Sequence, residues 1–337
     1  MQDTKYKSSA LVADPGDFLP APPAQSLRRG AAKLYHAVRR SAVGELWQWS
    51  QCKTISVPCV EQLVESLSLL SGTADEREDT EAPIFVLSPG WRSGSTLLQR
   101  ILVTDPHLLL WGEPLGEMAL VSRIAATLSS VNSFWFRERC ITDDVVLSSL
   151  ATSWIPTLCP PGDDFRLALR SLFDRWLGEP ARARGYERWG FKDVRMGATE
   201  AVLLSWLYPR AKFLVLSRHP YDCYRSLSDS GWQVFYRYPD VRADSAAGFA
   251  RHWNRLATSW SELPADFPAI HIKYEDLVNG GIDFRKLESW LGVELREGVA
   301  LSASVGHTAE RVKLAWHERL IIAQEADRGM QALGYSK

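Results

Sequence analysis

The sequence predicts an α/β fold in which a mostly parallel central sheet is flanked by helices, with an N-terminal helical extension. Two stretches carry this prediction, because each has an apolar run, a turn and then a helical pattern: residues 84–102 and 211–227. Their runs IFVL and KFLVLS are almost wholly apolar, as expected of strands that are buried on both faces. A hydrophobic fraction of 46% in 337 residues is enough for a large core.

The chain before the first of these strands is expected to be an extension. Residues 1–25 are polar and rich in proline, which predicts a flexible or extended arm. Residues 26–51 have a helical pattern with basic side chains. We expect this helix to pack on the main domain or on a second copy of the chain in a homodimer, a membrane-surface helix being the alternative. A second helix is expected near 60–70, and charged residues 72–81 lead into the main domain, 81–337.

Composition argues against several classes of protein. The net charge of −1 does not fit a general nucleic-acid binder, so any affinity for phosphate must be local. No apolar run reaches the roughly 18 residues of a membrane span, and no secretory segment opens the sequence. The five cysteines form no CxxC pair, which favours reduced thiols and a cytoplasmic location over disulfides or a zinc site.

An anion-binding loop is predicted after the first strand. Residues 88–90 break the strand, and a helix is expected from Ser95 or Thr96. The backbone N–H groups and the dipole of a helix N-terminus attract anions, and Gly94 lets a phosphate approach the backbone. Arg92 adds a permanently charged, planar guanidinium. The alternative is an ordinary strand–turn–helix connection with an exposed arginine.

This loop differs from the loop of nucleotide triphosphatases. That motif is GxxxxGK[ST], with a lysine that reaches the terminal phosphates. Here Gly90 and Gly94 are one residue too close, and no lysine follows Gly94. A phosphate-loop kinase therefore stays only as a rival interpretation.

The middle of the chain supplies further candidate side chains. A strand is expected at 108–110, with Glu113 just past its carboxyl end, where the ligands of open parallel sheets bind. Residues 116–180 are mostly helical in pattern. The segment GFKDVR could bring Lys192 back to the sheet, and a helix is expected at 199–208.

The second strand–loop–helix unit predicts a second anion site. A strand is expected at 212–217, and Arg218 follows it directly. Ser226 lies two turns into the next helix, so that it and Arg218 can converge on one phosphate. A helix at 245–263 and a strand at 269–277 complete the predicted elements.

Three motifs together resemble the sulfotransferase family that uses 3′-phosphoadenosine 5′-phosphosulfate (PAPS), over roughly residues 83–300. They are RSGST at 92–96, LSRHPYDCYRS at 216–226, and IKYEDL with FRKLESWLGV within 272–293. Their wording is most similar to the tyrosylprotein sulfotransferase branch and related bacterial enzymes. The resemblance implies a P-loop-like fold, with helices on both faces of the sheet. It also implies PAPS as the co-substrate and no metal.

The resemblance further implies which residues hold PAPS. The 5′-phosphosulfate would lie on the first loop and the 3′-phosphate at the second strand end. The implied PAPS-binding residues are Arg92, Ser93, Gly94, Ser95, Thr96, Arg218, Ser226 and Tyr274.

Catalytic roles follow from the same resemblance. Glu113 would be the base that takes the acceptor proton, while Arg92, Lys192 and Ser304 would stabilise the transferring group. In-line transfer of a sulfuryl group needs mainly positioning and charge neutralisation. The alternatives are a salt-bridged loop carboxylate for Glu113 and, for Lys192, a surface ion pair with the neighbouring Asp193.

We therefore expect a sulfotransferase that moves the sulfuryl group to a hydroxyl, leaving adenosine 3′,5′-bisphosphate. The acceptor is either a small molecule or a peptide, and the sequence does not choose between them. His107 and His307 are rival bases, because small-molecule members of the family use a histidine. A non-catalytic nucleotide-binding module is the remaining rival function.

Overall fold

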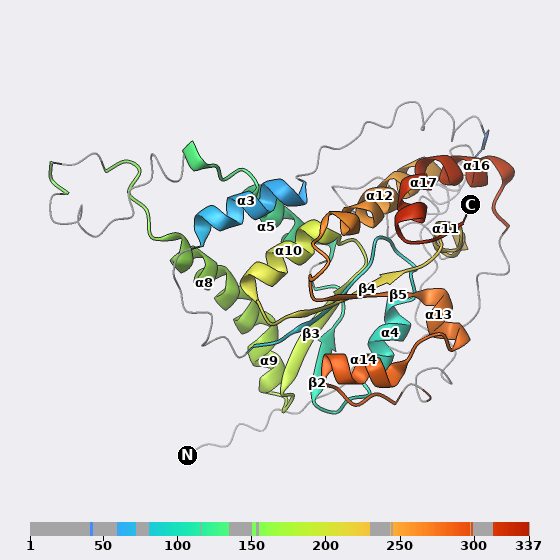
Figure 1. Ribbon diagram of the computed structural model, residues 1–337, viewed down its shortest axis with the longest axis horizontal. Coiled ribbons are helices and arrows are strands. Elements are labelled where there is room, and N and C mark those ends of the chain that lie inside the picture. The colour runs from blue at the N-terminus through green and yellow to red at the C-terminus, as the bar shows by residue number, and fades with distance from the viewer. Residues whose placement is uncertain are drawn as a thin grey trace, which may run out of the picture.

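A five-stranded parallel sheet lies at the centre of the computed structural model, with helices against both faces (Figure 1). The structure describes residues 41–42, 59–71, 81–114, 116–134, 150–152, 155–229, 243, 245–296, 298 and 313–336. Among them the strand order is β2-β3-β1-β4-β5. The strands are β1 (Ile84–Leu87), β2 (Leu108–Trp111), β3 (Arg188–Asp193), β4 (Lys212–Ser217) and β5 (Ala269–Lys273).

Helices cover the sheet in two layers (Figure 1). The first layer comprises α3 (Val60–Leu70), α5 (Leu120–Leu128), α8 (Gly162–Phe173) and α10 (Ala198–Leu207). The opposite face is covered by α4 (Ser95–Leu102), α13 (Tyr274–Asn279) and α14 (Phe284–Leu291). A third cluster joins α11 (Pro220–Asp229), α12 (Ala246–Ser259), α16 (Trp316–Glu325) and α17 (Asp327–Ala332). Short elements complete this part of the chain: η2 (Gly116–Met118), η3 (Asp174–Gly178), α9 (Glu179–Arg182) and η5 (Trp260–Glu262). None of the helices described here is both long and apolar enough to cross a membrane.

The apolar run of β1 is explained by its place in the middle of the sheet. Successive side chains of a strand point to opposite faces, so Phe85 packs toward α10 while Ile84 and Val86 pack toward α4. Its neighbour β3 approaches so closely that a Cβ on Gly190 would lie 1.8 Å from the Ile84 carbonyl oxygen. Glycine at this position therefore permits the observed pairing of the two strands.

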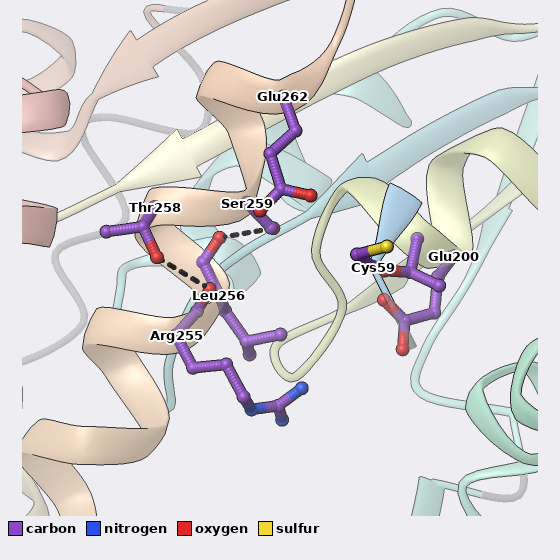
Figure 2. Close-up of a pocket in the computed structure, with 8 residues that line it drawn as sticks. Cys59, Glu200, Arg255, Leu256, Thr258, Ser259 and Glu262 are labelled. Carbon is purple, nitrogen blue, oxygen red and sulfur yellow. Dashed lines mark hydrogen bonds between the residues drawn. The ribbon is translucent and has the colours of Figure 1, made fainter. Parts of the chain in front are cut away.

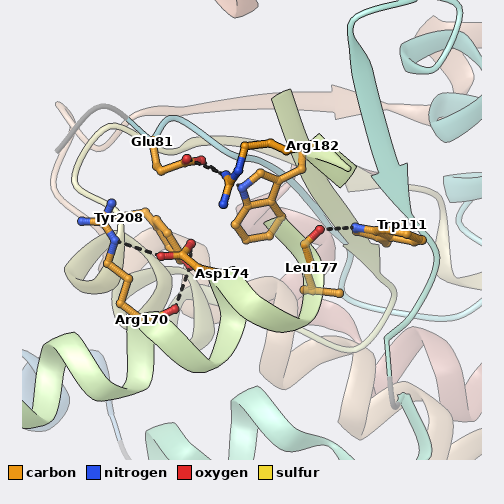
Figure 3. Close-up of polar contacts among 8 residues, drawn as sticks. Glu81, Trp111, Arg170, Asp174, Leu177, Arg182 and Tyr208 are labelled. Atoms are coloured by element: carbon orange, nitrogen blue, oxygen red, sulfur yellow. Dashed lines mark hydrogen bonds and ion pairs between the residues drawn. The ribbon is translucent and has the colours of Figure 1, made fainter. Parts of the chain in front are cut away.

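The edge strand β2 is fastened to the helical layer beside it (Figure 3). Helix α8 continues through the π-helical turn η3 into α9. Inside that turn, the Leu177 carbonyl accepts a hydrogen bond from the Trp111 indole N–H at 3.1 Å. The Asp174 carboxylate, at the start of the turn, accepts one from the Tyr208 hydroxyl at 2.8 Å. The Trp111 contact holds the end of β2, two residues before Glu113.

Most of the predicted elements are confirmed. The strands expected at 84–87, 108–110 and 212–217 are β1, β2 and β4, and the segment around Lys192 is the complete strand β3. The predicted strand at 269–277 is wrong in its second half, because β5 ends at Lys273 and α13 begins at the next residue. Acidic side chains in the first turn of α13 favour a helix start there.

The N-terminal predictions are tested only in part. The helix expected near 60–70 is α3, and its buried Leu63 and Leu67 belong to the core cluster that α5, α8 and α10 form on this face of the sheet. The arm at 1–25 and nearly all of the helix at 26–51 lie outside the described residues.

Candidate active site

The two predicted anion loops meet because their strands are neighbours. Strands β1 and β4 pair in parallel, so both loops leave the same carboxyl edge of the sheet. After β1 the chain turns through Arg92, in a left-handed conformation with φ 63°, and Gly94, with φ 89°. The backbone of Arg92 thus lies in a region of φ and ψ that residues other than glycine seldom occupy. Residues in this conformation are common at functional sites.

Side chains from three further elements close around this loop. The Arg92 Nε donates to Ser226 Oγ of α11 at 3.0 Å, and the Arg218 Nη1 donates to the Arg92 carbonyl at 3.1 Å. The Arg218 guanidinium lies over the Tyr274 ring, 4.3 Å from its centre. That ring covers Gly94, where an added Cβ would stand 2.1 Å from it. The predicted PAPS-binding residues thus form one group, which we call the donor site: Arg92, Ser93, Gly94, Ser95, Thr96, Arg218, Ser226 and Tyr274.

The donor site has polar groups that are suited to an anionic ligand. Two buried atoms, Ser93 Oγ and Arg218 Nε, have no hydrogen-bond partner within the described part of the chain. Gly94 caps α4 without a side chain that could bond the N–H groups of the first turn. An unsatisfied buried polar group costs about 1–3 kcal/mol, and phosphate or sulfate oxygens would satisfy these donors.

Helix α12 packs against the loop that carries Arg92. The Trp91 ring of the loop lies 5.1 Å from the ring of His252, centre to centre. A Cβ on Gly90 would stand 2.8 Å from the Trp253 ring, so the loop backbone lies against this helix. Burial holds the pKa of His252 well below its usual range, so the imidazole is neutral here. The sequence indicated a helix at this position but not its contact with the loop.

A second group of side chains lies one strand away. Lys192 is the penultimate residue of β3, and its Nζ lies 2.5 Å from the Glu113 Oε1, just beyond β2. The lysine is buried and the Glu113 side chain is 27% exposed. Lys192 is therefore buried and paired with Glu113, and the alternative of a surface ion pair with Asp193 is wrong. We call Glu113 and Lys192 the transfer pair.

A buried brace holds the loop that carries Glu113. Asp193 Oδ1 accepts the Arg195 backbone N–H at 3.0 Å, and the two side chains pair at 3.7 Å. The Arg195 Nη2 also donates to the Gly116 carbonyl, three residues after Glu113. Burial raises the pKa of Asp193 to about 6, against the opposing effect of the Arg195 charge. No pattern in the sequence marked this brace, beyond an Asp and an Arg soon after Lys192.

The rival base His107 is not brought to this place. His107 precedes β2 at the amino edge of the sheet, where it is exposed and lies 3.2 Å from Glu187. Since β2 and β3 are parallel, this edge is opposite the one that carries Glu113. Ser304 and His307 lie outside the described residues.

A separate cavity of about 160 Å³ lies between α3, α10 and the end of α12 (Figure 2). Its two carboxylates serve the adjoining helices: Glu200 accepts the Gly197 N–H at 2.8 Å, and Glu262 accepts the Val60 N–H at 3.3 Å. No residue of the donor site or of the transfer pair lines this cavity.

One known protein family and several solved structures match the chain. A family model described as "Sulfotransferase family" matches residues 83–297. Among solved structures, the chain is similar to the sulfotransferase domain of the Synechococcus PCC 7002 olefin synthase, with 19% identity and a TM-score of 0.41, covering 78% of this chain and 98% of that one. It is also similar to a sulfotransferase from Alicyclobacillus acidocaldarius, with 17% identity, a TM-score of 0.42, and coverage of 77% and 98%. No curated protein matches the chain.

Proposed function

We propose a reaction from one premise: the chain belongs to the sulfotransferase family, whose model matches residues 83–297. As a sulfotransferase it transfers sulfuryl groups, and our proposal adds the donor and the acceptor class. The donor is PAPS, the acceptor is a hydroxyl, and the products are a sulfate ester and adenosine 3′,5′-bisphosphate. The observation that carries the proposal is the set of contacts that joins Arg92, Arg218, Ser226 and Tyr274 around Gly94.

In this proposal the donor site binds the two charged ends of the nucleotide, the 5′-phosphosulfate and the 3′-phosphate. The loop residues from Arg92 to Thr96 bind the 5′-phosphosulfate, with backbone N–H groups and the α4 dipole adding to the arginine. Arg218 and Ser226 bind the 3′-phosphate. The unpartnered Ser93 Oγ and Arg218 Nε support this assignment, because both are donors that face no acceptor among the described residues.

The transfer pair then acts on the acceptor side. As the acceptor oxygen bonds to sulfur, the bond between sulfur and the phosphate oxygen breaks, and the hydroxyl proton passes to Glu113. Lys192 occupies Oε1 of that carboxylate, so we assign the proton to Oε2. Lys192 and Arg92 stabilise the charge that develops on the sulfuryl and leaving oxygens. We keep Ser304 as a further stabiliser on the strength of the resemblance alone.

The proposal is tested by incubating the full chain with labelled PAPS and a panel of phenols, alkyl alcohols and tyrosine peptides. Mass spectrometry should find a sulfated product and an equal amount of adenosine 3′,5′-bisphosphate. The variant Arg92→Ala should lose this activity. Arg100→Ala, which changes an exposed arginine in the last turn of the following helix α4, should keep it. Excess ATP should neither replace PAPS nor yield a phosphorylated acceptor. Phosphoryl transfer from ATP would contradict the proposal and favour a kinase.

A further inference from the structure

The segment 333–336, beyond the family match, lies against the turn that carries Arg218. The Tyr335 hydroxyl of this segment is placed between two polar atoms at 3.0 Å. One is Ser217 Oγ, at the end of β4, and the other is the Oε2 of Glu275, in the first turn of α13.

The backbone of the same segment is held as well. The Gly334 carbonyl accepts a hydrogen bond from Lys273 Nζ at 2.7 Å, and the Ser336 carbonyl lies 2.9 Å from the His219 Nε2. The Lys273 ammonium also lies 4.8 Å from the centre of the Tyr335 ring. The segment is therefore fixed by β5 and by the β4–α11 turn together.

Glu275 extends the contact from Tyr335 to the far side of the turn. Its Oε2 accepts from the tyrosine, while its Oε1 accepts the backbone N–H of His219 at 2.9 Å. Burial raises the pKa of Tyr335, so its hydroxyl stays a hydrogen donor to the carboxylate. Ser217 and His219, the two neighbours of Arg218, are thus both tied to this one tyrosine.

Arg218 belongs to the β4–α11 turn and contacts α13, and these are the two elements that Tyr335 connects. The arginine leaves the β4–α11 turn and lies over the ring of Tyr274, which is adjacent to Glu275 in α13. A change in the spacing of the turn and α13 would move the guanidinium relative to the ring. No contact between Arg218 and the segment 333–336 is needed for this effect.

We propose that Tyr335 is a positioning residue for the 3′-phosphate, acting through Ser217 and Glu275 on Arg218. This inference rests on the proposed function, since it assumes that Arg218 binds the 3′-phosphate of PAPS. Its consequence is selective: loss of the tyrosine hydroxyl should weaken the recognition of the 3′-phosphate and leave the 5′-phosphate site unchanged.

The test is the variant Tyr335→Phe, which keeps the aromatic ring and removes only the hydroxyl. Calorimetry on the full chain would measure the dissociation constants of adenosine 3′,5′-bisphosphate and adenosine 5′-monophosphate. We expect the affinity for the bisphosphate to fall roughly 3- to 10-fold, the scale of one lost hydrogen bond. The affinity for the monophosphate should not change. Ser217→Ala, which removes the other partner of the hydroxyl, should give the same selective loss.

The matched control is Tyr221→Phe on α11. Tyr221 stacks on His219 with 4.9 Å between ring centres, and its hydroxyl has no hydrogen bond within the described residues. This variant should bind both nucleotides as the wild type does. Equal losses for both nucleotides in Tyr335→Phe would reduce the tyrosine to a structural role, and unchanged binding would also overturn the inference. A wild type without preference for the bisphosphate would instead overturn the proposed function, and this inference with it.

Discussion

The donor site and the transfer pair are built in different ways. In the donor site, residues from four elements contact one another directly, and the Tyr274 ring covers the loop backbone at Gly94. The transfer pair is one ion contact between Glu113 and Lys192, and Arg195 bonds the backbone of the neighbouring loop. In our proposal, a donor molecule of constant shape binds the interlocked site, while the acceptor at the transfer pair can vary. Substitutions in the donor site and in the transfer pair should therefore have different effects on nucleotide affinity and turnover.

The largest effect is expected on the acceptor side, from Glu113→Gln. The amide keeps the shape of the carboxylate but cannot accept the proton, so turnover should fall roughly 10²- to 10⁴-fold. The affinity for adenosine 3′,5′-bisphosphate should change little. An alkyl alcohol should serve as the acceptor in steady-state assays, because the acidity of a phenol lessens the need for a base.

Glu187→Gln is the matched control for that experiment. Glu187 is an exposed carboxylate beside His107, at the opposite edge of the sheet. Its loss should leave turnover unchanged. Near wild-type turnover by Glu113→Gln would move the role of base to another residue, such as His307.

On the donor side, Arg92→Ala should damage binding and turnover together. The arginine is expected to touch the 5′-phosphosulfate, its phosphate oxygens included, both before and during transfer. It also bonds Ser226, so its loss loosens the contact between the loop and α11. We expect roughly a 10- to 100-fold loss of affinity for the bisphosphate by calorimetry, the scale of charge-assisted bonds. A variant with altered turnover and intact affinity would place Arg92 on the acceptor side instead.

A smaller effect is expected at Arg195, which sharpens the comparison because its side chain bonds Asp193 and the Gly116 carbonyl, beside the transfer pair. Arg195→Ala should lower turnover about 10-fold by releasing the Glu113 loop, with the affinity for the bisphosphate unchanged. Arg195→Lys, which keeps a positive charge beside Asp193, should recover part of the turnover. Equal loss of nucleotide affinity in Arg195→Ala would mean that the brace supports the donor site too.

The same variant has a signature in the pH dependence of its stability. Burial raises the pKa of Asp193 to about 6 in the folded protein, and Arg195 opposes this rise. A folded-state pKa above the unfolded value favours the protonated carboxyl, so stability from Asp193 is present at low pH and is lost as pH rises through about 6. Without the Arg195 charge, the ionised form of Asp193 is less favourable in the folded protein. The fall in melting temperature of Arg195→Ala should therefore be larger at pH 7.5 than at pH 5.

The sequence predicted the parts of the site that depend on local structure. An apolar run, a turn with Gly94 and a helix start predict the bounds of the loop that carries Arg92 to within a few residues. The separation of Arg218 from Ser226 likewise follows from one strand end and one helix. Both are short-range patterns, which a single sequence expresses directly.

The remaining features depend on strand order, which no local pattern contains. Lys192 meets Glu113, 79 positions away, only because β3 lies between β2 and β1. The brace at Arg195 follows from the same placement. Tyr335 reaches Ser217 across 118 positions, and no motif marked it. The predicted strand runs four residues past the end of β5: Glu275 and Asp276 favour a helix start, but Lys273 at the N-cap makes no side-chain capping bond that would mark it.

The central claim is that the donor site binds a nucleotide with a 3′-phosphate, and Arg218 tests it most directly. Calorimetry would compare adenosine 3′,5′-bisphosphate with adenosine 5′-monophosphate on the wild type and on Arg218→Ala. We predict that the wild type prefers the bisphosphate and that the variant binds it roughly 10- to 100-fold more weakly, through loss of one or two charge-assisted bonds. The variant should then discriminate poorly between the two nucleotides. A wild type without this preference, or a variant that keeps it in full, would contradict the account.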